Sequence, residues 1–162
     1  MPARIFWVQE ASPNRLALMP RPRSGDWLED EVREWRDAGI DTVVSLLEPF
    51  EENELELGEE RALCEGFGIE FLSFPIPDRG VPTSLPEAKK LVDELVARLA
   101  AGKAVAIHCR VGIGRSGLIT ACVLVRLGMP FDNVFEVLGR ARGLPVPDTT
   151  EQVHWTKLFA LN

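Results

Sequence analysis

Two apolar stretches flank a short glycine-rich segment between residues 104 and 128, and this arrangement constrains the fold more than any other feature of the sequence. The first stretch, AVAIHC, covers residues 104–109 and is typical of a strand that is buried on both faces. The second, LITACVLVRLG, covers residues 118–128 and predicts a helix that is apolar all round and therefore central. A buried strand followed by a buried helix favours an α/β domain with a parallel sheet.

The rest of the chain alternates in the same way. Hydrophobic periodicity and turn residues predict further strands at 5–8, 16–19, 42–47 and 69–76, and helices at about 26–39, 84–102, 131–142 and 148–161. After residue 47 we expect an acidic loop and then a helix that begins at Asn53 or Gly58 and ends at Glu65. Asp26 is expected to cap the first helix, and Asp148 with Glu151 the last.

No repeat, low-complexity tract or linker divides the sequence, so we expect residues 1–162 to form one domain. Its fold class is α/β, with a central, mainly parallel sheet flanked by helices. In such sheets ligands bind beyond the carboxyl ends of the strands, which places the candidate loops after Leu47, Ile76 and Cys109.

Charge and composition restrict the partners. The formal net charge is −7 and the sequence pI is about 4.9, which argues against nucleic acid or an anionic membrane surface as the main partner. The first ten residues, MPARIFWVQE, lack an apolar core long enough for a signal peptide, and no run approaches the length of a membrane helix, so we expect neither. The three cysteines show neither CxxC nor zinc-ligand spacing. We therefore expect a soluble, cytoplasmic monomer without metal, cofactor or stable membrane association.

The segment between the two apolar stretches has the chemistry of an oxyanion site. Cys109 ends the predicted strand and Arg115 begins the predicted helix, so the backbone N–H groups between them can converge on an anion. Gly112 and Gly114 suit a close backbone approach or a positive φ. The planar guanidinium of Arg115 can bind two phosphate or sulfate oxygens at once.

The same environment favours a thiolate at Cys109, so we expect its pKa to be lowered. A thiolate held beneath a bound phosphate is placed for attack, which implies a cysteinyl-phosphate intermediate. Ser116 can donate a hydrogen bond to the departing sulfur, and His108 is expected to order the loop by hydrogen bonding.

The pattern His108-Cys109-x-x-Gly112-x-x-Arg115-Ser116-Gly117 resembles the signature of the cysteine-dependent protein tyrosine phosphatases. In length and element order the chain is similar to the compact atypical dual-specificity phosphatases, roughly from Leu16 to Trp155. The resemblance implies a metal-independent phosphomonoester hydrolase with Cys109 as nucleophile. It also implies that the intervening loop binds the phosphate, namely Arg110, Val111, Gly112, Ile113 and Gly114.

The family also needs a general acid, and Asp78 fits this role. It lies in the loop PIPDRGVP, 31 positions before Cys109, which is the spacing that such phosphatases usually show. This loop follows a neighbouring strand and should lie at the same edge of the sheet. By resemblance, Asp78 is the acid in the first step and the base in the second.

Other residues carry weaker signals. Glu48 reaches the same edge, although an acidic loop residue is usually only solvated. Arg79 and Arg110 are candidates for attracting a phosphorylated substrate, with Arg21 and Arg23 as weaker ones. Four more residues have simpler interpretations, as core thiols (Cys64, Cys122) or as polar positions of the terminal helix (Gln152, His154).

Three alternatives to a phosphoprotein phosphatase stay open. The first is a phosphatase for a phosphoinositide or a sugar phosphate; relatives acting on inositol lipids often carry lysines in this loop, and here there are none. The second is a module that binds a phosphorylated or sulfated ligand without turnover. The third is a sulfurtransferase, against which the His-Cys and Arg-Ser ends of the loop and Asp78 argue.

Overall fold

The computed structural model describes residues 3–162, and its centre is a five-stranded sheet with the order β1-β2-β5-β3-β4. The strands are β1 (Phe6–Trp7), β2 (Leu16–Met19), β3 (Thr42–Ser45), β4 (Glu70–Ser73) and β5 (Val105–His108). All neighbours pair in parallel except β1, which is antiparallel to β2. The predicted α/β class with a mainly parallel sheet is therefore confirmed.

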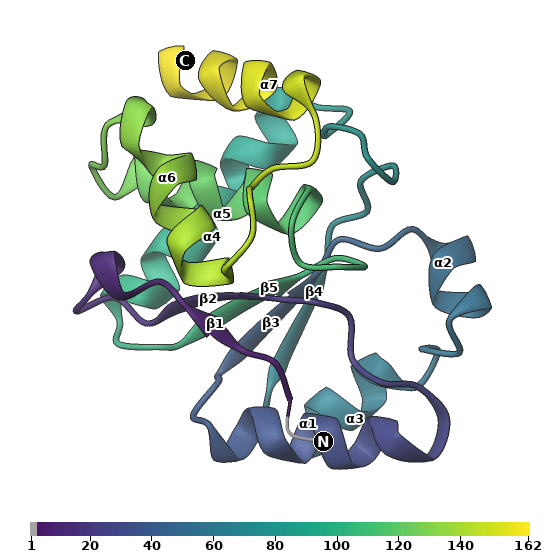
Figure 1. Cartoon of the computed structure of the whole chain (residues 1–162). Helices are drawn as coiled ribbons and strands as arrows, with labels where there is room; N and C mark the ends of the chain where they lie inside the picture. Colours follow the sequence, from purple (N-terminus) through teal and green to yellow (C-terminus); the bar gives the residue numbers. More distant parts are fainter. Residues whose placement is uncertain (1–2) are drawn as a thin grey trace.

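Helices cover both faces of the sheet (Figure 1). They are α1 (Leu28–Asp37), α2 (Pro49–Glu54), α3 (Glu60–Gly66), α4 (Leu85–Ala100), α5 (Arg115–Arg126), α6 (Phe131–Arg142) and α7 (Thr150–Leu161). The helices α4 to α7 lie on one face, and α1 and α3 lie on the other. As its all-round apolarity predicts, α5 is central: it contacts β2, β5, α4, α6 and α7. No helix between residues 3 and 162 is both long and apolar enough to cross a lipid bilayer.

The register of the sheet brings the carboxyl ends of three strands together. Met19 of β2 and Ser45 of β3 both pair with His108 of β5. The segments that follow these strands consequently leave the sheet side by side, and α2 and the loop before α5 extend from this edge (Figure 1). Apolar side chains such as Val44 and Ile107 fill the core on the α5 face, which fixes this edge relative to α5.

The structure corrects three expectations about helix boundaries. The acidic segment expected as a loop contains α2, a helix with Pro49 in its first turn. A short 3₁₀ turn (Gly25–Trp27) precedes α1, and the Asp26 side chain caps neither element. The capping box of α7 is Thr149 with Gln152, one residue later than the expected Asp148 with Glu151. Asp and Thr are both strong caps, so local preference alone did not decide between them.

Candidate active site

The sulfur of Cys109 lies at the carboxyl end of β5, inside the loop of residues 109–115, here called the signature loop. The Gly112 N–H donates to it over 3.3 Å, and Ser116 Oγ lies 3.2 Å away. Cys109 is only 3% exposed, whereas Val111 at the tip of the loop is exposed. The thiol therefore lies at the bottom of a backbone loop and directly before the N-terminus of α5.

The surroundings of Cys109 favour the thiolate. Burial alone would raise the pKa of the thiol, but hydrogen bonds from the Ser116 hydroxyl and from the Ser116 and Gly112 N–H groups oppose this. The positive charge of Arg115 acts in the same direction, and together these effects hold the Cys109 pKa below its ordinary value. This is the direction that the sequence predicts for a nucleophilic cysteine.

Glycine is required in the signature loop for two different reasons. Gly112 has a φ of +81°, and a Cβ atom there would lie 2.7 Å from the Met19 carbonyl carbon and the Pro20 nitrogen. At Gly114 a Cβ atom would collide with the Asp148 carboxylate. From the other side, Arg142 of α6 donates to the carbonyls of Val111 (3.0 Å) and Gly112 (3.1 Å). The loop is thus held by packing on one side and by a buried arginine on the other.

Arg115, the expected phosphate clamp, is held in place by several hydrogen bonds within the chain. It is buried, and its two terminal nitrogens donate to Glu51 over 2.7 and 2.9 Å. A further bond of 3.0 Å reaches the Ile76 carbonyl. Burial would raise the pKa of Glu51, but the bonds from Arg115 and the Glu48 N–H hold it below its ordinary value. Glu51 therefore stays ionised and fixes the plane of the guanidinium.

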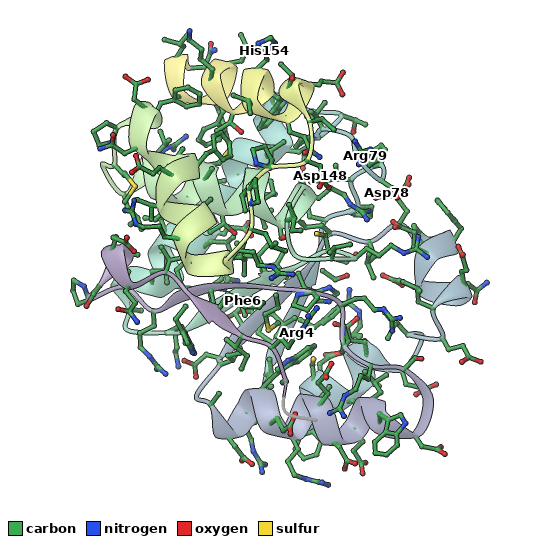
Figure 2. The ribbon with its side chains drawn as sticks, in the orientation of Figure 1. Arg4, Phe6, Asp78, Arg79, Asp148 and His154 are labelled. Atoms are coloured by element: carbon green, nitrogen blue, oxygen red, sulfur yellow. The ribbon has the colours of Figure 1, made fainter. Side chains whose placement is uncertain are left out.

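Asp78 meets the same guanidinium from the loop after β4. Its Oδ1 accepts a hydrogen bond from Arg115 over 3.1 Å, and its side chain is 50% exposed, in contrast to the fully buried Glu51. Figure 2 labels Asp78 and Arg79 on this loop and Asp148 in the segment that precedes α7. Gln152 ties the two segments together, because its side chain donates to the Gly80 carbonyl over 3.0 Å. The expected acid and the expected nucleophile thus share one site.

His108 has two acceptors, one at each ring nitrogen. Nε2 lies 2.6 Å from a carboxylate oxygen of Glu60 on α3, and Nδ1 lies 3.1 Å from the Cys109 carbonyl. The doubly protonated ring satisfies both acceptors. Burial lowers the pKa of His108, but the Glu60 carboxylate raises it above the ordinary value overall. This geometry agrees with a role for His108 in ordering the loop.

The remaining residues singled out in the sequence are more scattered. Arg110 lies 3.5 Å from Glu54 and 3.8 Å from Glu51, at the rim of the site. Ile113 packs against the apolar core on the α5 face. The Glu48 N–H donates to Glu51, so Glu48 acts at the start of α2. His154 is exposed on α7, away from the signature loop (Figure 2).

Three charged residues that support the site were not expected from the sequence: Glu51, Glu60 and Arg142. Glu51 had a usable signal, because it follows β3 at the functional edge and stands three residues after Glu48, at capping-box spacing. Glu60 and Arg142 had none. A glutamate at the start of a helix and an arginine at its end are ordinary helix-dipole positions.

Comparisons with known proteins identify the family. Residues 17–129 match the family described as "Polymorphic toxin system, DSP-PTPase phosphatase". Cyclin-dependent kinase inhibitor 3 of Rattus norvegicus is 29% identical over 134 residues, covering 82% of this chain and 63% of that protein. Protein tyrosine phosphatase domain-containing protein 1 of Mus musculus is 36% identical over 129 residues, covering 74% of this chain and 16% of that protein. The match thus spans less than two thirds of either relative.

Solved structures agree with this assignment. The kinase associated phosphatase superposes with a TM-score of 0.87 at 23% identity, over 98% of this chain and 94% of that one. Tk-PTP in its active form superposes with a TM-score of 0.78 at 27% identity, over 98% and 97%. Sequence and fold together place the chain in the cysteine-dependent protein tyrosine phosphatase superfamily, among proteins of the compact atypical dual-specificity type. Within it, the chain belongs to the DSP-PTPase phosphatase family that matches residues 17–129.

Proposed function

We propose that this chain hydrolyses phosphomonoesters on phosphorylated proteins, on tyrosine as well as serine or threonine, without a metal ion. One observation carries the proposal: a buried cysteine with a lowered pKa, an arginine fixed by a buried carboxylate, and a half-exposed aspartate lie in one site. A chance collection of charged residues would not place a thiol against two backbone N–H groups and a hydroxyl.

In the first step the Cys109 thiolate attacks phosphorus, and the bond from phosphorus to the substrate oxygen breaks. Arg115 and the N–H groups of the signature loop bind the phosphoryl oxygens, whose charge builds up in the transition state. Asp78 gives its proton to the leaving oxygen. Asp78 suits this role better than Glu51, because Asp78 is half-exposed and accepts a single bond from Arg115, whereas Glu51 is fully buried and accepts two bonds that keep it ionised.

In the second step a water molecule attacks the cysteinyl phosphate, and Asp78 takes up the proton that this water loses. The sulfur–phosphorus bond breaks, and inorganic phosphate leaves. The negative charge returns to Cys109, where the Ser116 hydroxyl and the Gly112 N–H stabilise it. The site thus returns to its starting protonation state after each turnover.

We further propose that residues 1–162 act as one catalytic domain and as a monomer. All three cysteines are free thiols, which suits a reducing compartment such as the cytoplasm. Light scattering on the purified chain tests the monomer, and a dimer at micromolar concentration would contradict it.

Hydrolysis of p-nitrophenyl phosphate in the presence of a chelator tests the mechanism. We expect turnover by the wild type and none by Cys109→Ser, while the control Cys122→Ala, also a buried thiol, keeps it. Asp78→Asn should lower turnover mainly for esters with poor leaving groups. Equal loss for all esters would contradict the acid role, and turnover by Cys109→Ser would overturn the mechanism.

The class of substrate is tested separately, with a panel of phosphopeptides, phosphoinositides and sugar phosphates. We expect phosphotyrosine and phosphothreonine peptides to be hydrolysed in preference to phosphoinositides and sugar phosphates. A preference for either non-protein ester would replace the phosphoprotein assignment. Tight binding of phosphopeptides by the wild type without release of phosphate would instead identify a binding module.

A further inference from the structure

Arg142, in the last turn of α6, is a buried cation without a carboxylate partner. Only 7% of it is exposed, and within residues 3–162 no aspartate or glutamate forms an ion pair with it. Buried charges are ordinarily paired, because removing them from water is costly. An arginine cannot avoid this cost by losing its proton at neutral pH. The charge of Arg142 must therefore be balanced by something other than a carboxylate.

Two carbonyl groups and one aromatic ring surround the guanidinium of Arg142. Its nitrogens donate to the carbonyls of Gly112 and Val111 over 3.1 and 3.0 Å. Its central carbon lies 4.3 Å from the centroid of the Phe6 ring on β1, within the range of a cation–π interaction. Figure 2 labels Phe6 in this N-terminal segment. The ring and the two carbonyls together fix the guanidinium behind the signature loop.

The two carbonyls belong to peptide groups whose N–H ends face away from Arg142. A peptide group is planar, and in its trans form the C=O and the N–H point in opposite directions. The bonds between Val111 and Gly112 and between Gly112 and Ile113 are both trans. The bond to the Val111 carbonyl therefore directs the Gly112 N–H to the other side, where it donates to the Cys109 sulfur over 3.3 Å. The bond to the Gly112 carbonyl likewise directs the Ile113 N–H away from Arg142.

Arg142 also differs in charge balance from the other two cations of the site. Arg115 donates to the Glu51 carboxylate over 2.7 and 2.9 Å. The His108 ring lies 2.6 Å from a carboxylate oxygen of Glu60. Each of these cations is thus largely neutralised by a carboxylate within the chain, whereas Arg142 adds a net positive charge behind the signature loop.

This charge and the thiolate stabilise each other across the loop. Burial lowers the pKa of Arg142 most, and the charge of Arg4 lowers it further, whereas the negative charge of Cys109 raises it. A cation bonded to a carbonyl oxygen polarises the peptide group, so that its N–H becomes a stronger donor. An anion in front of the loop therefore compensates the buried charge behind it.

We propose that Arg142 is a positioning residue for phosphoryl transfer: it orients the N–H groups of Gly112 and Ile113 and supplies the positive charge that balances the thiolate and the bound phosphate. Arg142 touches neither the sulfur nor the substrate and acts through two peptide groups. Phe6 holds its guanidinium, so β1 becomes part of the support of the site. The inference rests on the proposed function and assigns a further residue to it.

Two substitutions separate the charge of Arg142 from its shape. Arg142→Met removes the charge and both hydrogen bonds, and Arg142→Lys keeps the charge without the planar fork. The first readout is the affinity for tungstate, a tetrahedral oxyanion that is not hydrolysed. We expect this affinity to fall about tenfold in Arg142→Met, because two charge-assisted bonds are lost, and less in Arg142→Lys. Turnover of p-nitrophenyl phosphate should follow the same order.

The second readout is the pH dependence of Cys109 alkylation by iodoacetamide. Its midpoint should move to higher pH in Arg142→Met, because the thiolate loses a compensating charge. The control Arg140→Met removes an exposed arginine of the same helix, which is paired with Glu136, and should change neither readout. Both readouts are taken on folded protein, below the thermal transition of each variant, and neither requires turnover.

Wild-type tungstate affinity and alkylation in Arg142→Met would overturn the inference, since a merely structural arginine changes only the thermal transition. If Arg142→Met does not fold, Phe6→Leu is decisive: it keeps Arg142 but removes the ring that holds it. A loss of tungstate affinity of about threefold is then expected, and an unchanged affinity overturns the inference. Absence of p-nitrophenyl phosphate turnover in the wild type contradicts the proposed function itself. Wild-type turnover with unchanged readouts in the variants overturns only the role of Arg142.

Discussion

Two buried cysteines, one just before α5 and one within it, have pKa values shifted in opposite directions. Cys109, before α5, and Cys122, within α5, belong to the same apolar cluster and are 3% and 0% exposed. Burial raises the pKa of Cys122 far above its ordinary value, and the weak opposing effects of Arg126 and Thr156 do not compensate. At Cys109 the donors of the signature loop reverse this effect of burial. Directed hydrogen bonds, and not exposure, therefore distinguish the cysteine with the lowered pKa from the cysteine with the raised pKa.

The largest effect on the contrast between Cys109 and Cys122 is expected when Arg115, the proposed phosphate clamp, is replaced. Arg115→Lys keeps a positive charge but loses the planar fork that contacts Glu51, Ile76 and Asp78 together. We expect kcat/KM for p-nitrophenyl phosphate to fall by about 10³-fold. Arg126→Lys, at the other end of α5, serves as the control and should change kcat/KM less than twofold. A loss below tenfold in Arg115→Lys would show that charge alone suffices.

Direct alkylation compares the cysteines without any substitution. At pH 6.5 we expect iodoacetamide to label Cys109 at least 100-fold faster than Cys122 or Cys64, because only Cys109 has a lowered pKa. Mass spectrometry of the digested protein gives the three rates. In denaturant the three rates should converge, which serves as the control. Similar rates in the folded protein would contradict the contrast.

Removal of a single hydrogen-bond donor should raise the pKa of Cys109 part of the way toward that of Cys122. In Ser116→Ala the Cys109 pKa should rise, because one hydrogen bond to the thiolate is lost. The acid limb of the pH profile should then shift to higher pH, since less thiolate is present at a given pH. Thr120→Val, whose hydroxyl has no hydrogen-bond partner, is the control. An unshifted acid limb would remove Ser116 from the set of effective donors.

The smallest effect is expected at Glu60, which acts through His108. Glu60→Gln removes the charge that raises the His108 pKa, so this pKa should fall. The Cys109 pKa should rise slightly as the neighbouring cation is lost. Nuclear magnetic resonance reports the first change and pH-dependent alkylation the second. Glu65→Gln, exposed on the same helix, should leave both values unchanged.

The same pair links stability to pH. Because folding raises the His108 pKa above its ordinary value of 6.5, the protonated ring stabilises the fold. This contribution is complete below pH 6.5 and is lost as the pH rises through the folded-state pKa. The difference in unfolding free energy between the wild type and Glu60→Gln should therefore be larger at pH 6 than at pH 9. A pH-independent difference would argue that His108 is neutral in the fold.

Sequence patterns predicted those strands and helices whose burial is evident from runs of apolar residues. The strand β2 and the helix α6 have the predicted boundaries, and α5 is as central as its composition indicates. The segment of α2 contains three glutamates among six residues and lacks an apolar periodicity, so it resembled a loop. Tertiary contacts of Glu51 hold this short helix in place, and a local pattern does not record them.

In the site, too, the residues that are close in sequence were predictable, and those that act through tertiary contacts were not. Cys109, Arg115 and Ser116 are close in sequence, and the parallel order of strands was enough to bring Asp78 to the same edge. Glu60 and Arg142 act through partners that are 48 and 30 residues away. Charged residues are usually exposed, so only the packed structure shows which of them are buried to hold a neighbour.

The contact between Arg115 and Asp78 also bears on how phosphate leaves. Arg115 is bonded within the chain to two carboxylates, and one of these, Asp78, lies on a half-exposed loop. Under the proposed function, inorganic phosphate competes with Asp78 for the guanidinium when it rebinds, so it gains less than it would from an unpaired arginine. Under the proposed function we therefore expect product inhibition to be weak, so that turnover continues as phosphate accumulates.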